Sequence, residues 1–300
     1  MPVVSARPDR DDLAPPDGAP PTRHVTSRRI VAVRGASLEV RDDRVTGEAP
    51  LEIRAVGPRQ EPVAVAVTMR TPGSEAELAA GFLWTEGLLE GQEVLGAAAG
   101  DPGRLNQPDD TVLVRLSRPF DDSKVAERHF VATASCGICG KASIDEVALR
   151  SDPIPAGPVV PRAVILALPD LLRAAQRAFE ETGGLHAAAL FTPQGELIAV
   201  REDVGRHNAL DKLVGSQVLG GSMPLNDRIL MVSGRVSFEI VQKAAVAGIP
   251  IVAAVSAPSD LAIETADRLG VTLVGFLRGD GFNVYSHDDR IDLRDLSGLG

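Results

Sequence analysis

The segment that decides the fold contains three short apolar runs, ILMV at residues 229–232, IVAAV at residues 251–255 and VTLVGF at residues 271–276. Continuous apolar runs of this length are typical of strands that are buried on both faces of a sheet. Helical patterns at residues 238–247 and 259–269 separate the runs. This alternation predicts an α/β fold, with a largely parallel or mixed sheet and helices on both faces.

Four more elements are predicted directly upstream: strands at residues 187–191 and 197–200, a helix at residues 208–218, and a helix that begins at Pro169 and ends at Gly183-Gly184. Further towards the N-terminus, apolar and polar residues alternate with the period of two that half-buried strands show. The alternating sets are Leu51, Ile53 and Ala55, then Val63, Val65, Val67 and Met69, then Val112, Val114 and Leu116. Ser74 and Glu77 have the spacing of a capping box, which predicts a helix after Ser74.

These patterns predict three parts of the chain. Residues 1–23, which are rich in Pro, Asp and Arg, are expected to be a disordered tail. Residues 24–130 are expected to form a small α+β domain. Residues 131–300 are expected to form the α/β domain.

The bulk composition excludes several classes of function. The chain has 300 residues, a net charge of −10 and a pI of about 5.1, so binding to nucleic acid is not expected. No stretch approaches the roughly 20 apolar residues that cross a membrane, and the N-terminus lacks the apolar core of a signal peptide. We therefore expect a cytoplasmic protein without a structural disulfide.

The only two cysteines form the motif Cys136-Gly137-Ile138-Cys139. A thiolate is a nucleophile, and the nearby Lys141 and the start of a predicted helix are expected to favour it. Cys136 is predicted to hold sulfur as a persulfide, with Cys139 assisting the transfer or reclaiming an oxidised Cys136. The pair also fits half of a zinc site, a thioredoxin-like redox pair or an inert pair, although zinc would need further ligands from five histidines or from a partner subunit.

Polar clusters follow several predicted strands, where open α/β sheets bind their ligands. The clusters are Arg201–Asn208, Ser233–Arg235, Ser256–Ser259 and Phe276–Gly281. Arg206, Arg235 and Arg278 are suited to phosphate, and small residues leave room for a ligand near the backbone. This pattern predicts a pocket for a phosphate-bearing ligand, with His207 as a further candidate.

The motifs together resemble the formate dehydrogenase accessory sulfurtransferase family, FdhD. The matching stretches include Ser135–Gly140, Thr182–Leu190, Arg201–Asn208 with Asp211-Lys212, Ser233–Arg235, Glu239–Ala244, Ala247–Pro250, Ser256–Pro258, Gly275–Arg278 and Asn283–Tyr285. The resemblance runs from about Ile30 to Tyr285. It implies a homodimer whose C-terminal part has a three-layer, cytidine-deaminase-like fold.

The resemblance also implies a function. Cys136 would accept sulfur from a cysteine desulfurase and pass it, with Cys139, to a molybdenum bis(molybdopterin guanine dinucleotide) cofactor that formate dehydrogenase needs. The cofactor contacts are carried over to Phe276, Leu277, Arg278, Gly279, Asp280 and Gly281, although Gly279–Gly281 lack an expected basic side chain. No resident metal is implied.

Two other functions stay open on the sequence. One is a cofactor chaperone that does not transfer sulfur, with the thiols incidental. The other is a zinc hydrolase of the deaminase kind, which needs a His-x-Glu element and a proline before the first cysteine. The sequence has neither, since Ser135 precedes Cys136.

Overall fold

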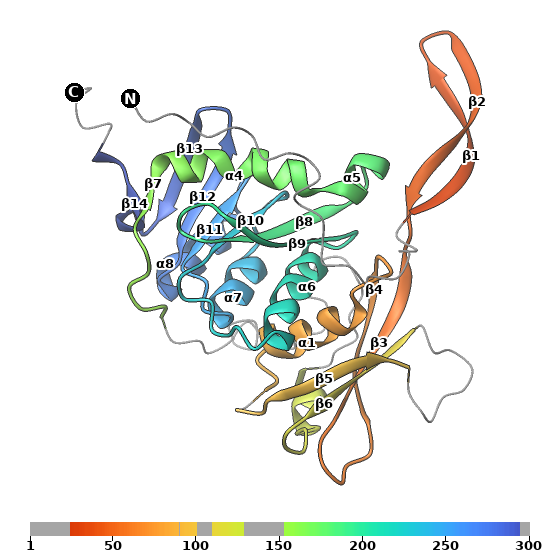
Figure 1. The fold of residues 1–300 in the computed structure, drawn as a ribbon, viewed down its shortest axis with the longest axis vertical. Coiled ribbons are helices and arrows are strands. Elements are labelled where there is room, and N and C mark those ends of the chain that lie inside the picture. Colours follow the sequence, from red (N-terminus) through yellow and green to blue (C-terminus); the bar gives the residue numbers. More distant parts are fainter. Residues whose placement is uncertain (1–24, 90, 101–109, 129–152, 295–300) are drawn as a thin grey trace.

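A six-stranded mixed sheet forms the centre of the molecule, as the computed structural model in Figure 1 shows. The structure describes residues 25–89, 91–100, 110–128 and 153–294. In spatial order, the strands are β13 (Gly281–Ser286), β12 (Thr272–Arg278), β11 (Ile251–Ala254), β10 (Ile229–Val232), β8 (His186–Phe191) and β9 (Leu197–Asp203). The three apolar runs form β10, β11 and β12, which are parallel to one another. The other three strands run antiparallel to their neighbours, so the predicted mixed α/β fold is confirmed.

Helices cover both faces of this sheet. The helices are α4 (Arg162–Ala175), α5 (Arg177–Thr182), α6 (Arg206–Leu219), α7 (Phe238–Val246) and α8 (Asp260–Leu269). Along β8, Ala187 and Phe191 pack with α4 on one face, and Ala188 and Leu190 pack with α6 and α7 on the other. A short parallel pair, β7 (Val160–Pro161) and β14 (Ile291–Asp292), flanks the sheet, and a 3-10 turn spans Asp288–Arg290.

A second, four-stranded sheet lies in the N-terminal part. Its strands, in spatial order, are β4 (Val63–Arg70), β3 (Ala49–Val56), β6 (Thr111–Leu116) and β5 (Val94–Ala99), and the helices of this part are α1 (Glu75–Thr85) and α2 (Ser123–Arg128). The predicted alternation is observed, since Leu51, Ile53 and Ala55 are fully buried on one face of β3. They form a separate core with Leu78 and Leu83 of α1.

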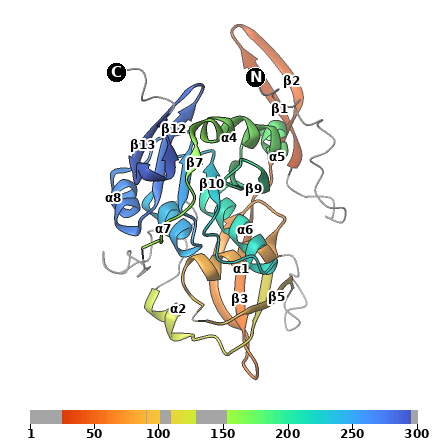
Figure 2. The same cartoon turned by 60° about the vertical axis from the view of Figure 1, so that its left-hand side comes forward.

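Helices α1 and α6 join the two parts and lie side by side, as Figure 2 shows. They approach each other most closely at two glycines. A Cβ atom on Gly81 of α1 would lie 1.8 Å from the carbonyl oxygen of Asp211. A Cβ atom on Gly215 of α6 would lie 1.7 Å from the carbonyl oxygen of Glu77. The helices therefore touch backbone to backbone, which only glycine permits at these positions.

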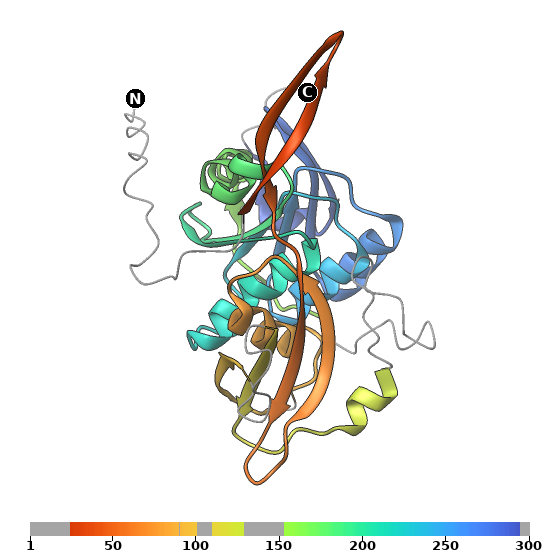
Figure 3. The same ribbon diagram turned by 90° about the vertical axis from the view of Figure 1, so that its right-hand side faces the viewer.

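A two-stranded ribbon projects from the body, as Figures 1 and 3 show. It consists of β1 (Val25–Arg34) and β2 (Ser37–Thr46), which pair only with each other. We call it the arm. At its base, Arg44 forms an ion pair with Glu181 at 2.6 Å, and the hydroxyl groups of Thr46 and Thr182 lie 3.0 Å apart.

Two local predictions are wrong. Pro169 lies inside α4, because the helix already begins at Arg162 and the buried Leu168 and Leu172 hold its middle on the sheet. The capping box of Ser74 and Glu77 does not form. Ser74 has a left-handed backbone (φ 57°) and makes no capping hydrogen bond through its side chain.

Other calls lie outside the described residues. The tail at residues 1–23 and the predicted boundary at residue 130 are among them, so the division into domains stays a prediction. Within the described ranges, no helix is long and apolar enough to cross a membrane.

Candidate functional site

The structure brings the predicted polar clusters to one edge of the central sheet. The carboxyl ends of β10, β11 and β12 lie there because the three strands are parallel. The amino end of β8 lies there too, since β8 runs antiparallel to β10. The loops at this edge start at Ser233 after β10 and at Val255 after β11, and helix α6 begins nearby at Arg206. We call this the carboxyl edge.

Backbone contacts tie the loops of the carboxyl edge together. The amide of Ser233 donates to the carbonyl of Ala187, and the Ser233 hydroxyl accepts from the Ala187 amide at 2.9 Å. The amide of Val236 donates to the carbonyl of Ala257 at 3.2 Å. The amide of Phe276 donates to the carbonyl of Ser256, also at 3.2 Å. The clusters that begin at Ser233, Ser256 and Phe276 are therefore joined through backbone hydrogen bonds.

Three arginines at this edge have no carboxylate partner within the described residues: Arg206, Arg235 and Arg278. Arg235 and Arg278 are exposed, and Arg206 is half-buried with its Nε atom buried and without a hydrogen bond. Many other arginines of this acidic chain are paired, such as Arg201 with Glu77 and Arg294 with Asp292. Unpaired guanidinium groups gathered at strand ends suit a ligand with several negative charges.

The predicted cofactor segment, Phe276–Gly281, spans the end of β12, a turn and the start of β13. Phe276 has a left-handed backbone (φ 52°) at a bulge between the two strands, and 37% of its side chain is exposed. The Arg278 guanidinium lies 5.8 Å from the centre of the Phe276 ring. A strained, exposed aromatic residue at a bulge is a feature often found at ligand sites.

Not every residue of this segment presents a side chain to a ligand. Leu277 is fully buried and packs with α4, so it can offer only its backbone. The carbonyl of Asp280 accepts a hydrogen bond from Arg162 at 3.3 Å, which fixes the turn against the first residue of α4. Phe276 and Arg278 are therefore the side chains in the segment best placed for contact.

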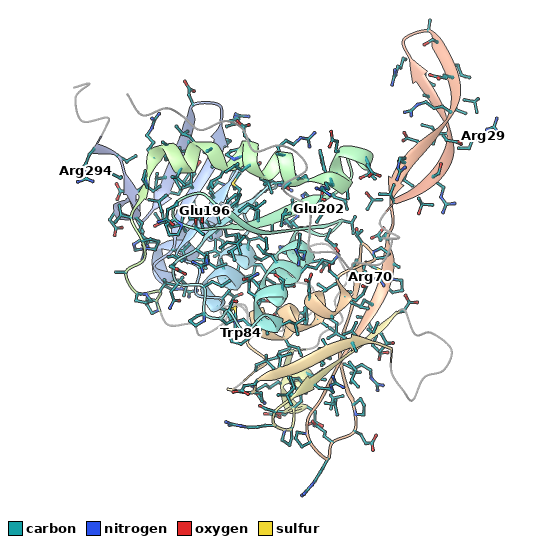
Figure 4. All side chains as sticks on the ribbon, viewed as in Figure 1. Arg29, Arg70, Trp84, Glu196, Glu202 and Arg294 are labelled. Carbon is teal, nitrogen blue, oxygen red and sulfur yellow. The ribbon has the colours of Figure 1, made fainter. Side chains whose placement is uncertain are left out.

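The cluster Arg201-Glu202-Asp203 is used inside the protein. Both nitrogens of the Arg201 fork contact the carboxylate of Glu77 at 2.6 Å. Glu202 accepts hydrogen bonds from the amides of Ala178 and Phe179 at the start of α5, which Figure 4 shows near Glu202. The first three residues of the predicted cluster therefore hold structure, and its candidate site residues are Arg206 and His207.

Asp203 links the same strand to helix α6. It is fully buried and lies 2.7 Å from the ammonium of Lys212. It also accepts a hydrogen bond from the amide of Thr71 at 3.0 Å. Asp203 and Lys212 therefore hold the first turns of α6 against the N-terminal part.

Two histidines lie in or beside the edge. His186 is half-buried against Gly234, and burial, followed by the positive charge of Arg206, lowers its pKa. His207 lies 3.2 Å from the Ser237 hydroxyl and 3.5 Å from Glu239. Burial and the charges of Lys243 and Arg206 lower the pKa of His207 to about 3. Both rings are therefore neutral at pH 7.

This neutral ring makes folding stability depend on pH. The ordinary histidine pKa is about 6.5, so protons bind the unfolded chain first as the pH falls. The contribution of His207 is complete above pH 6.5 and is lost progressively towards pH 3. The loss is about 1.4 kcal/mol for each pH unit below 6.5, so it amounts to about 2 kcal/mol at pH 5. Urea unfolding at pH 7 and pH 5 should show that His207→Gln loses about that much less than the wild type. An equal change in the free energy of unfolding between pH 7 and pH 5 for the two proteins would refute this role.

A cavity of about 590 Å³ opens beside the edge, between the end of α4, helix α5 and the loops after β10 and β11. Its lining includes His186 and Ser233. Gln176 also lines it, is only 5% exposed, and makes no side-chain hydrogen bond within the described ranges. The ring of Phe179 lies 4.6 Å from the guanidinium of Arg173. The cavity therefore offers a flat apolar wall and a free amide.

Sequence reasoning missed this wall. The segment from Arg162 to Thr182 reads as an amphipathic helix that packs on a core, and Leu172 does so. The break at Gln176, between α4 and α5, turns the polar amide towards the cavity. The sequence feature that could have indicated the cavity is Gly183-Gly184, because both glycines line the cavity as well as following the end of α5.

A second missed feature is a buried charged cluster behind the edge. The ammonium of Lys243 in α7 lies 2.9 Å from Asp211 of α6 and 2.9 Å from Glu86 at the end of α1. Thr85 completes it, since its hydroxyl donates to Asp211 at 2.6 Å. Burial alone would lower the pKa of Lys243, but Asp211 and Glu86 raise it above its usual value. The cluster links three helices through the ammonium group of Lys243, which stays charged.

The cysteine motif lies outside the described residues, as does the start of the helix predicted after it. The described ranges contain no group of three or more His, Cys, Asp or Glu side chains arranged to hold a metal ion. What the structure defines is a mixed α/β protein with three arginines at one edge of its central sheet and an adjoining cavity.

Comparison with known proteins places the chain in a family. The sequence profile of the FdhD/NarQ family matches residues 47–292, and the chain belongs to that family. The sulfur carrier protein FdhD of Streptomyces avermitilis is 48% identical over 288 residues, which cover 92% of this chain and 99% of that one. The protein of the same name from Mycobacterium tuberculosis is 46% identical over 277 residues, covering 88% and 97%. The one from Sulfurisphaera tokodaii is 41% identical over 263 residues, covering 88% and 97%.

A solved structure supports the fold. The crystal structure of a candidate formate dehydrogenase accessory protein from Desulfotalea psychrophila matches with a TM-score of 0.66. It covers 90% of this chain and all of that chain, at 24% sequence identity. At this identity the likeness concerns the fold alone.

Proposed function

We propose that this protein is a sulfurtransferase that carries sulfur as a persulfide on Cys136 and delivers it to a molybdenum bis(molybdopterin guanine dinucleotide) cofactor for formate dehydrogenase. The observation that carries the proposal is the pairing of two features. The chain has a lone Cys136-Gly-Ile-Cys139 motif, and its relatives at up to 48% identity over most of their length are named sulfur carrier proteins. By the same resemblance, the C-terminal part is cytidine-deaminase-like and two copies of the chain pair as a homodimer.

The loading step needs only a thiolate. The Cys136 thiolate attacks the outer sulfur of a persulfide on the cysteine desulfurase. The outer sulfur becomes bonded to Cys136, and the cysteine of the desulfurase leaves as a thiolate. In the delivery step, the Cys139 thiolate attacks the inner sulfur of the Cys136 persulfide. A Cys136–Cys139 disulfide forms and the outer sulfur leaves as hydrosulfide, so the two cysteines together supply the two electrons that reduce it. This chemistry belongs in the cytoplasm, where the disulfide is reduced again.

The carboxyl edge fits the proposed substrate. The cofactor carries several phosphates, and Arg206, Arg235 and Arg278 are available for them. Phe276 offers an exposed ring beside Arg278. The cavity at Gln176 has room and hydrogen-bonding capacity for a ring system. Within the carried-over segment Phe276–Gly281, the exposed side chains of Phe276 and Arg278 support the proposal.

The experiment separates loading from delivery. After incubation with a cysteine desulfurase and cysteine, mass spectrometry should find one added sulfur on the wild type and none on Cys136→Ala. Cys139→Ala and Arg278→Ala should load sulfur like the wild type but fail to restore formate dehydrogenase activity in a strain that lacks the protein. Arg268→Ala, on the exposed face of α8, is the matched control and should do both.

Two results would favour the alternatives. If Cys136→Ala restored formate dehydrogenase activity, the protein would act as a chaperone without transferring sulfur. Bound zinc together with deamination of a nucleoside would instead support a deaminase-type hydrolase. Sulfur loading of Cys136→Ala equal to that of the wild type would remove Cys136 as the carrier.

A further inference from the structure

The arm carries an apolar face that nothing in the described chain covers. Val31, Val33, Leu38 and Val40 are 59%, 68%, 69% and 50% exposed. The register pairs Val31 with Val40 and Val33 with Leu38, so all four lie on the same face of the ribbon. Figure 1 shows this outer half of the arm standing clear of the body. We call these four residues the aliphatic face.

Such a ribbon needs a partner. A hairpin of two strands is at best marginally stable in water by itself, and both of its outer edges expose unpaired backbone groups. The base of the arm is held by Arg44 and Thr46 at helix α5, but these contacts lie at the opposite end from the aliphatic face. A binding partner that is present whenever the chain is folded explains the arm better than a partner that binds only transiently.

We propose that the aliphatic face of the arm packs against the body of a second copy of this chain. Charge favours this occupant. The arm contains five arginines and three carboxylates, which give it a charge of +2, whereas the whole chain carries −10. The positive arm of one copy is therefore attracted to the negative body of the other. Figure 4 shows Arg29 extending into solvent from the arm.

Size favours it as well. A standard interface uses roughly 20 to 30 residues from each side, and the arm from Val25 to Thr46 is of that length. A two-fold arrangement uses both arms, since each copy supplies one arm and one body. This inference rests on the homodimer proposed above and adds the surface that forms it.

The test is the mass of the full chain in solution, measured by sedimentation with Val33→Lys and its matched control Ala32→Lys. The two substitutions add the same charge at adjacent positions, but Ala32 lies on the opposite face of the ribbon. The wild type and Ala32→Lys should sediment at twice the 31.5 kDa of one chain. Val33→Lys should raise the dissociation constant about a hundredfold or more, because a two-fold dimer loses two buried valine contacts.

Leu38→Lys, on the other strand of the arm, should raise the dissociation constant in the same way. It replaces Val33→Lys as the test if Val33→Lys does not fold. A wild type that sediments as a single chain, or Lys variants at 33 and 38 that stay dimeric, would overturn the inference. Equal dissociation by Ala32→Lys would do so too. Sulfur loading on Cys136 is measured separately, so a failure here leaves the proposed transfer reaction standing, and the reverse holds as well.

Discussion

Replacing Lys243 with methionine should cost about 3–5 kcal/mol of folding stability at pH 7. The substitution leaves the carboxylates of Asp211 and Glu86 in the junction of α1, α6 and α7 without their cation. Uncompensated buried charge is among the most destabilising changes known in folded proteins. Lys243 is only 2% exposed, so water cannot replace it. Urea unfolding followed by circular dichroism measures the loss.

The same cluster provides the control. In Lys243→Met the stranded carboxylates take up protons more readily than in the unfolded chain, so the deficit should shrink when the measurement is repeated at pH 5. The double variant Lys243→Met, Asp211→Leu should recover part of the loss, since it removes a buried charge as well. A Lys243→Met protein as stable as the wild type at both pH values would show that the cluster contributes nothing to stability.

Replacing Gly81 with alanine should destabilise the protein by about 3 kcal/mol or more, and replacing Gly215 should do the same. The added methyl group would sit within 1.8 Å of a carbonyl oxygen of the facing helix, and backbone cannot move aside as a flexible side chain does. The roughly 1 kcal/mol that alanine gains over glycine in helix propensity does not offset this. Thermal unfolding of each variant beside the wild type measures the cost.

Ser216→Ala is the matched control, because it changes the neighbour of Gly215 in α6 without adding a carbon atom to the contact. It should alter stability by less than about 1 kcal/mol. If Gly81→Ala and Gly215→Ala unfolded at the temperature of the wild type, the close approach of α1 and α6 would not be needed for the fold.

Local patterns in the sequence were sufficient to predict five of the six strands of the central sheet, all but β13. The runs at residues 229–232, 251–255 and 271–276 are short, apolar and separated by helices, so period and length alone predict β10, β11 and β12. The same order predicts that their carboxyl ends meet. Arg235 and Arg278 could therefore be placed at a common edge before any coordinates.

What failed depends on contacts between distant positions. Glu77 looks like the end of a capping box, but it is bound by Arg201, which is 124 residues away along the chain. Glu202 looks like a ligand-binding residue, but it holds the start of α5. Gln176 gives no signal at all, because only the break between α4 and α5 turns its amide into the cavity. Residue spacing cannot report partners of this kind.

Helix α6 belongs both to the candidate site and to the contact between the two parts of the protein. Its first turn supplies Arg206 and His207 to the carboxyl edge, and its middle is pressed against α1 of the N-terminal part at Gly215. The N-terminal part therefore cannot swing without displacing two residues of the site. Ligand binding at the carboxyl edge should therefore need no hinge motion between the two parts, because the scaffold holds a preformed binding surface.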